Sequence, residues 1–169
     1  ITGGNIVIYN SGVGVKNTPI SGANTKVTVY SNTTGIQGGS INGGTVKTYN
    51  GIAGNTTGLN GVNISGGYID VQKNGTGIKN GTIGSGVKGV TISGNTVGID
   101  GAVINKDVTV TGAGKTVANG YGIKNSNITN GATVSVASIG IDITNKSIDA
   151  ANKTINVTGN VTGINSGSI

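Results

Sequence analysis

Seven residue types are missing from this chain: Cys, Met, Phe, Trp, His, Glu and Arg. The absence of Cys excludes a disulfide framework and any thiolate metal site, and it fits an exported protein that avoids thiols. Without His, Cys or Glu the chain lacks both a nucleophilic triad and an ordinary zinc ligand set. We therefore expect no metal and no cofactor.

Charge is also scarce, with 11 Lys, five Asp and a net charge of +6. A nucleic-acid interface would favour clustered Lys and Arg with aromatic residues, whereas these Lys are spread over nearly all of the chain. The sequence therefore predicts no nucleic-acid partner. No apolar run approaches the length needed to span a membrane. Enzymes that cut polysaccharides need clustered carboxylates. Here Asp100 and Asp107 fall on different sides of a turn, so we expect no enzyme.

The residues that dominate the chain are Gly, Asn, Thr, Val and Ile, and they form a repeat. Its clearest copy is Gly-Ile-Lys-Asn-Gly-Thr-Ile at 77–83. The pattern is Gly, an aliphatic residue, a polar residue, a turn-former, two spacers and Ile. Further copies occupy 14–20, 35–41, 58–64, 98–104, 122–128 and 163–169, with a stretched copy at 140–148. Eight copies give a mean spacing of about 21 residues, which is typical of a repeat architecture.

Each repeat also holds a triplet in which an outer residue separates two aliphatic ones. The triplets are 6–8, 27–29, 46–48, 69–71, 90–92, 108–110, 134–136 and 155–157, and Thr48 is the only weak member. Alternation of β-branched residues predicts strands, and no window has the 3.6-residue period of a helix. One repeat then contains three short strands and three corners. It can bury its apolar side only by stacking on copies of itself.

The sequence therefore predicts an all-β fold, a single-stranded right-handed parallel β-helix of about eight coils, each of about 21 residues with three short strands. Residues 1–169 would form one continuous segment, and we expect it to be a slice of a longer repeat protein. One inward column should contain Ile1, Ile20, Ile41, Ile64, Ile83, Ile104 and Ile128. Two insertions, 49–57 and 111–121, fall at the same corner and should protrude from one side.

Outward positions of neighbouring coils should also form columns. The polar residue after the anchor aliphatic predicts a charge ladder of Lys79, Asp100, Lys124 and Asp142, and the triplets place Lys47 beside Asp70. We interpret these charges as structural, because exposed ion pairs contribute only about 0–1 kcal/mol each. A carboxylate-based metal or catalytic site is the alternative. Asn17, Asn80 and Asn125 could stack at the fixed corner, whereas Asn-x-Thr triplets such as those at Asn32 and Asn55 are expected by chance.

Three tyrosines, Tyr9, Tyr30 and Tyr49, follow successive triplets and should stack. Such a strip is either a stabilising cross-strand ladder or a flat platform for a sugar or protein partner. Tyr68 and Tyr121 fall outside the column, and Tyr121 should pack the second insertion down. The candidate binding residues are these three tyrosines together with Lys115 and Tyr121.

The repeats at 77–83 and 98–104 resemble the passenger region of large bacterial autotransporter adhesins and of filamentous-haemagglutinin-like proteins. The resemblance covers the whole chain and depends on composition and period. It implies a β-helical stalk that is secreted through an outer-membrane barrel and presents binding surfaces to host cells or other bacteria; some members are toxins. No family motif for catalysis or receptor contact is matched, so no residue role is carried over.

Three functions follow as hypotheses. The first is an extracellular adhesin stalk at the bacterial cell surface, which would bind a host or bacterial surface protein or glycan through its protruding loops and the Tyr strip. The second is a structural fibre or surface-layer element whose partners are copies of itself. The third is a toxin passenger.

Overall fold

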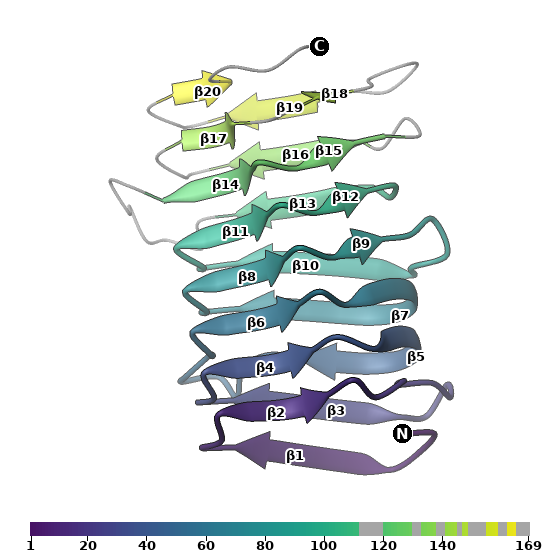
Figure 1. Cartoon of the computed structure of the whole chain (residues 1–169). Helices are drawn as coiled ribbons and strands as arrows, with labels where there is room; N and C mark the ends of the chain where they lie inside the picture. Colours follow the sequence, from purple (N-terminus) through teal and green to yellow (C-terminus); the bar gives the residue numbers. More distant parts are fainter. Residues whose placement is uncertain are drawn as a thin grey trace.

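The chain forms a β-solenoid of stacked parallel coils (Figure 1). This computed structural model describes residues 1–111, 120–129, 133–137, 141–144, 147–148, 155–158 and 162–164. These residues contain 20 strands and no helix. In Figure 1 the chain runs left to right along the near sheet, returns right to left along the far sheet and rises towards the C-terminus. That path is a right-handed winding, as the sequence predicts.

One sheet has eight strands, each contributed by a separate coil. In spatial order these strands are β2 (Val13–Lys16), β4 (Thr34–Gln37), β6 (Thr57–Asn60), β8 (Thr76–Lys79), β11 (Val97–Asp100), β14 (Tyr121–Lys124), β17 (Ile141–Thr144) and β20 (Thr162–Ile164). Every pair of neighbours in this sheet is parallel.

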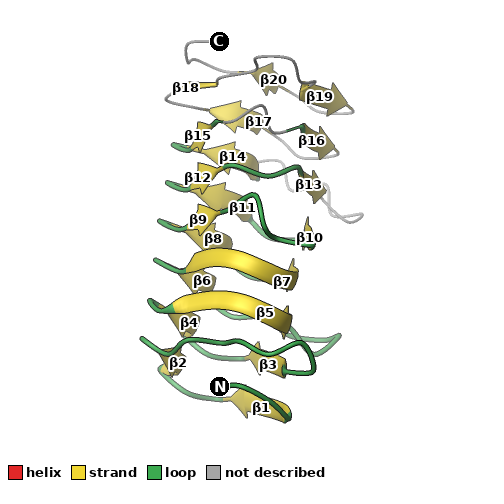
Figure 2. Ribbon diagram, turned by 90° about the vertical axis from the view of Figure 1, so that its right-hand side faces the viewer, coloured by secondary structure: helices red, strands yellow, loops and turns green. Residues whose placement is uncertain are grey.

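The second sheet has 12 strands and holds the two remaining strand positions of each coil. The triplets lie in β1 (Asn5–Tyr9), β3 (Lys26–Tyr30), β5 (Ser40–Lys47), β7 (Asn63–Gln72), β10 (Gly89–Ser93), β13 (Val108–Thr111), β16 (Val134–Ala137) and β19 (Ile155–Thr158). The short strands that end the seven-residue unit are β9 (Thr82–Ile83), β12 (Val103–Ile104), β15 (Asn127–Ile128) and β18 (Ser147–Ile148). In β5 and β7 both positions merge into one strand that turns a corner (Figure 2).

The register follows the repeat. Ile20, Ile41, Ile64, Ile83, Ile104 and Ile128 each face the next across a parallel pair. From Ile1 to Ile128 the chain makes about six turns, with 19 to 24 residues between successive isoleucines. The prediction of about eight coils is therefore slightly higher than these six turns, and β16 to β20 belong to the coils beyond Ile128.

The core is a set of aliphatic columns parallel to the solenoid axis. The six isoleucines from Ile20 to Ile128 have no exposed surface, and Ile1 packs against the same cluster. A second column contains Val15, Ile36, Leu59, Ile78, Ile99 and Ile123, and the flanking residues of the triplets complete the interior. Full burial of one such side chain stabilises the fold by roughly 1.5–3 kcal/mol. The predicted inward columns are confirmed.

The glycine that opens the unit at 14, 35, 58, 77 and 98 is required by contact between coils. A methyl group added at Gly77 would lie 2.6 Å from the carbonyl oxygen of Gly98, and one added at Gly35 would lie 2.6 Å from that of Gly58. The same close approach occurs between Gly98 and Gly122, at 2.5 Å. The end of a flexible side chain could move aside, but these carbonyl oxygens belong to the backbone. A larger residue at these positions therefore forces neighbouring coils apart.

We predict that Gly77→Ala lowers the free energy of unfolding by about 1–3 kcal/mol, the usual cost of overpacking. Gly12→Ala is the matched control, since nothing lies within 4 Å of a methyl group there. Urea denaturation of both variants measures the difference. Equal stability of the two proteins would contradict the steric explanation.

The fixed corner after the anchor aliphatic adopts the left-handed backbone conformation. Asn17, Asn80 and Asn125 have φ angles of 49°, 51° and 52° there. Neighbouring coils carry Gly38 or Gly101 at this place, also with positive φ. Gly38, Gly61 and Gly101 separate these asparagines along the described coils, so Asn17, Asn80 and Asn125 do not form the amide stack that their repeat position suggests.

A buried asparagine ladder lies at a different corner, where each triplet strand leads to the next unit. Asn32, Asn55, Asn74 and Asn95 occupy successive coils and are at most 9% exposed. Each Nδ2 group donates to the Oδ1 atom of the next asparagine, at 2.9, 3.1 and 2.9 Å. Their Oδ1 atoms also accept backbone N–H groups of the preceding coil, beginning with Ser11.

The ladder satisfies polar groups that the solenoid would otherwise leave buried and unpaired. The second amide hydrogen is also used: Asn55 donates to the carbonyl of Thr48, and Asn95 to that of Val71. The hydroxyl of Thr48 accepts from Asn74, so the weak triplet member is buried with a partner. Because the amide nitrogens of Asn32 and Asn55 are buried and bonded, their Asn-x-Thr triplets are structural.

We predict that Asn74→Ala destabilises the protein by about 1–3 kcal/mol for each buried group that loses its partner. Asn63→Ala removes an exposed asparagine, and it should change stability by less than about 0.5 kcal/mol. Thermal and urea unfolding of the two variants test this. A ladder variant as stable as the surface variant would show that the amide chain contributes nothing net.

Candidate binding surface

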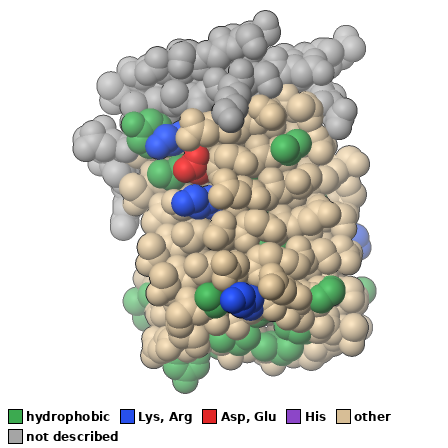
Figure 3. Space-filling model, in the orientation of Figure 1, with side chains coloured by type: hydrophobic (Ala, Val, Ile, Leu, Met, Phe, Trp, Pro, Cys, Tyr) green, Lys and Arg blue, Asp and Glu red, His purple; other side chains and the backbone are tan. Residues whose placement is uncertain are grey.

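The predicted charge ladder forms in part, on the outer face of the eight-stranded sheet. Parallel register places Lys79 and Lys124 on either side of Asp100, and Figure 3 shows Lys, Asp and Lys one above another on a face with few other charges. Asp100 accepts a hydrogen bond from the Nδ2 group of Asn125 at 2.9 Å. Lys124 lies over the ring of Tyr121, 5.0 Å from its centroid.

Asp142 does not belong to this column, which corrects the prediction. Lys124 pairs with Thr144, and Ile123 pairs with Ile143. Asp142 therefore falls at the register position of the glycine that opens the unit. Residues of the two coils pair when they are counted back from the isoleucine that ends each unit, Ile128 or Ile148. Thr144 precedes Ile148 by the same four residues that separate Lys124 from Ile128.

The second predicted charge pair is present. Lys47 and Asp70 are register partners, and Lys47 Nζ lies 3.9 Å from Asp70 Oδ2. Gln72 Nε2 donates to the other carboxylate oxygen at 2.5 Å. The Lys47 side chain is 48% exposed, so solvent screens the pair and its contribution is small.

Two of the three candidate tyrosines stack. The rings of Tyr9 and Tyr30 are 5.1 Å apart between centroids and 6° from parallel. They are register partners at the ends of β1 and β3, and Tyr9 remains 53% exposed. Tyr49 lies beyond the end of β5, where it lines a shallow pocket with Thr28, Lys47, Asn50 and Gly51. The flat aromatic surface that the structure shows is therefore the Tyr9–Tyr30 pair.

Next to Tyr49, the loop 48–56 connects β5 to β6 and corresponds to the first predicted insertion. Asn50 organises its turn, since its Oδ1 atom accepts the N–H groups of Ile52 and Ala53, both at 3.0 Å. The N–H group of Asn50 donates to the carbonyl of Ala53 at 3.3 Å. Lys73 Nζ, from the next coil, donates to the carbonyl of Gly51 at 2.6 Å. Hydrogen bonds thus hold this loop in one conformation.

The tip of this loop is apolar. Ile52 is 87% exposed, the highest value among the exposed large hydrophobic residues. An isoleucine held in water contributes nothing to the core of its own chain. The sequence predicts the insertion 49–57 but does not single out Ile52. The signal that could have found it is a lone aliphatic residue outside every repeat position.

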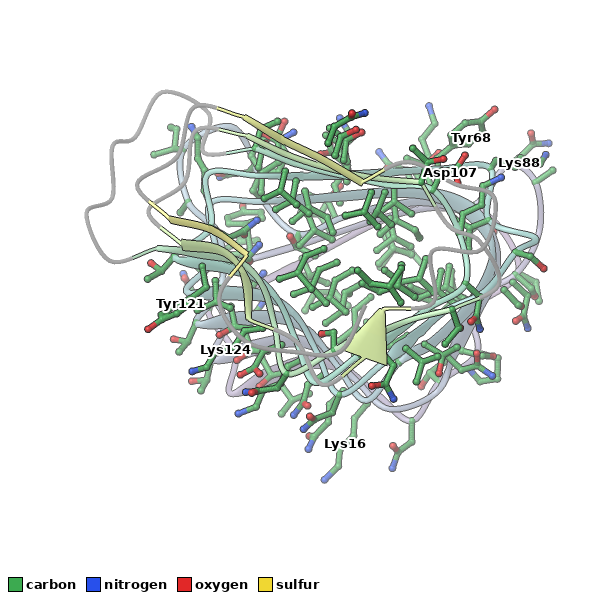
Figure 4. All side chains as sticks on the ribbon, turned by 90° about the horizontal axis from the view of Figure 1, so that it is seen from above. Lys16, Tyr68, Lys88, Asp107, Tyr121 and Lys124 are labelled. Atoms are coloured by element: carbon green, nitrogen blue, oxygen red, sulfur yellow. The ribbon has the colours of Figure 1, made fainter. Side chains whose placement is uncertain are left out.

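The second insertion, 111–121, lies mostly outside the described residues, and so does Lys115. Its flanking strands are β13 and β14, so it leaves the solenoid at the same corner as the loop 48–56. Tyr121 lies in β14, beside Val97 of the coil below. Figure 4 shows Tyr121 and Lys124 next to each other on the outside of the solenoid, with aliphatic side chains filling the interior.

The described residues contain no group of three or more Asp, Glu, His or Cys side chains that could hold a metal ion. Among them there is also no helix with the length and hydropathy of a membrane span. Comparisons with protein-family models, curated proteins and solved structures found no match. The loop 48–56, which includes Tyr49, and the Tyr9–Tyr30 pair form the candidate binding surface, because the loop exposes Ile52 and the pair exposes Tyr9.

We predict that replacing Tyr9 and Tyr30 together by Ser lowers the free energy of unfolding by about 0.5–1.5 kcal/mol, the contribution expected of an aromatic pair. Tyr49→Ser is the comparison, and it should cost less. Thermal unfolding measures both. If the double variant also loses binding to a partner while remaining folded at the assay temperature, the pair is a platform; unchanged binding would make it a structural ladder.

Proposed function

We propose that this chain is a non-catalytic segment of an extracellular adhesin at the bacterial cell surface. The solenoid acts as a rigid stalk, and the protruding corner loops contact the partner. The observation that carries the proposal is the loop 48–56, which hydrogen bonds hold in place while it exposes Ile52. Functional contacts are commonly placed on loops that a rigid scaffold positions.

A pre-ordered apolar tip favours binding for a physical reason. Association costs free energy when it immobilises loops and side chains, and a loop that is already ordered avoids most of that cost. Ile52 can bury its side chain in an apolar pocket of a partner, and such desolvated anchors dominate interface energies. Lys47, 48% exposed beside the same loop, favours a pocket with an acidic rim. The partner that fits is a surface protein of a host cell or another bacterium.

A structural fibre is the second candidate. It is favoured by the uniform stacking of the coils, whose aliphatic columns are continuous through the described core. In a fibre the solenoid has a purely structural role, and its outer surface contacts other copies of the chain. The two candidates differ in what Ile52 does.

The adhesin proposal is tested with beads that carry the purified chain and are incubated with epithelial cells and with bacteria. We expect Ile52→Asp to reduce the number of bound beads at least about tenfold, because burial of a charge in an apolar pocket is costly. Asn63→Asp is the control: it places the same charge at an exposed position, at the opposite end of β6 from the loop.

Attachment that is equal for Ile52→Asp and the parent chain would overturn the role of the loop. Failure of the parent chain to attach to any of the cells would overturn the adhesin proposal. Concentration-dependent assembly of the parent chain in light scattering, together with that failure, would support the fibre.

A further inference from the structure

One corner of the solenoid varies in length from coil to coil. This corner lies between the buried isoleucine that ends the unit and the following triplet strand. Five residues separate Ile41 from Val46 and Ile64 from Ile69, whereas seven separate Ile20 from Val27 and Ile83 from Val90. Two short corners therefore lie between two longer ones along the axis.

The short corners are recessed. They lie within β5 and β7, which turn the corner as continuous ribbons in Figure 2. The longer corners of the neighbouring coils lie below and above them. A groove occupies this recess and is lined by Gly22, Ala23, Asn42, Gly43, Gly44, Ser65, Gly66, Gly67, Tyr68, Gly86 and Lys88. Since coils repeat every ~4.8 Å, the four coils that line it extend over roughly 14 Å.

The floor of this groove has no side chains because coil stacking forbids them. A methyl group at Gly44 would lie 2.5 Å from the carbonyl oxygen of Thr25, and one at Gly67 would lie 2.7 Å from that of Gly44. Both glycines also have positive φ, at 75° and 81°. A ligand in the groove can therefore approach the backbone directly.

Uncharged polar side chains border the floor. The hydroxyl of Ser65 donates to Asn42 Oδ1 at 2.7 Å, and Asn42 Nδ2 donates to the hydroxyl of Ser40 at 3.2 Å. Asn42 and Ser65 are both exposed. Each amide and hydroxyl group has further capacity to donate or accept, so this pair can exchange hydrogen bonds with the hydroxyl groups of a ligand.

Tyr68 forms one wall. It is 55% exposed, and its ring leans over Gly89 of the next coil, where an added methyl group would lie 3.3 Å from Tyr68 Cδ1. Gly89 and Tyr68 are register partners, so the glycine leaves room for the ring. Figure 4 shows Tyr68 and Lys88 projecting outwards at the same corner. The wall thus combines a flat apolar face with a nearby cation.

We propose that this groove is a saccharide-binding site. A sugar ring presents a C–H face that packs on an exposed aromatic ring and hydroxyl groups that bond to amides and hydroxyls. A peptide added as a strand fits less well, because β5 is already paired on both sides, by β3 and β7, and strand addition needs a free edge. No carboxylate lines the groove, so it lacks the ligands that a hard metal ion prefers.

This site is separate from the loop 48–56, and it holds for an adhesin and for a fibre alike. The test is a microarray of neutral and acidic oligosaccharides probed with the purified chain, followed by titration of a bound oligosaccharide monitored by NMR. We expect Tyr68→Ala to weaken binding at least about tenfold, and Tyr68→Phe, which keeps the ring, to retain binding within about twofold. Asn42→Ala should also weaken binding.

Val7→Ala is the control, because Val7 is about as exposed as Tyr68, at 51% against 55%, and does not line the groove; it should leave binding unchanged. Melting temperatures of all variants separate lost binding from lost structure. If the parent chain binds no oligosaccharide on the array, the proposal is wrong. So would sugar binding that survives both Tyr68→Ala and Asn42→Ala, since the ligand would then bind elsewhere. Neither result bears on attachment through Ile52.

Discussion

The distance between neighbouring coils, set by parallel backbone hydrogen bonds at about 4.8 Å, constrains every other part of this molecule. Gly35, Gly77 and Gly98 are required because backbone carbonyls of the next coil lie too close for a Cβ atom. Side-chain amides of the asparagine ladder meet at hydrogen-bonding distance because the same spacing separates them. Tyr9 and Tyr30 stack at 5.1 Å for that reason as well. The same distance between coils, about 4.8 Å, thus favours glycine, asparagine and aromatic residues at different positions of the repeat.

The constraint acts on the interior and leaves the corners free. Inward columns accept only aliphatic residues of similar size, because each must pack against its counterparts above and below. Extra residues at a corner extend into water, so the length of a corner can change without disturbing the columns. Both candidate sites arise in this way. The loop 48–56 comes from a longer corner, and the groove beside Tyr68 comes from two shorter corners between longer ones. Function in this fold is therefore expected where the repeat length changes.

Most of the architecture could be predicted because a 21-residue period and the alternation in the triplets both report burial directly. The isoleucine column from Ile20 to Ile128 shows this. Asp142 falls outside the predicted charge ladder because the register follows Ile148, which pairs with Ile128, and not Gly140. The asparagine ladder was missed although Asn32, Asn55, Asn74 and Asn95 each precede the unit glycine by three residues. The sequence alone does not show whether a polar side chain is exposed to water or is buried and hydrogen-bonded to another coil.

The asparagine ladder also gives the solenoid an internal direction. Every amide in it donates towards the C-terminal neighbour and accepts from the N-terminal one, so the amide dipoles align head to tail. Aligned hydrogen bonds polarise one another and strengthen along the row. A completed coil therefore presents oriented amide hydrogens as a template for the next asparagine oxygen. In a fold whose units contact only their neighbours, the row therefore has a donor end towards the C-terminus and an acceptor end towards the N-terminus.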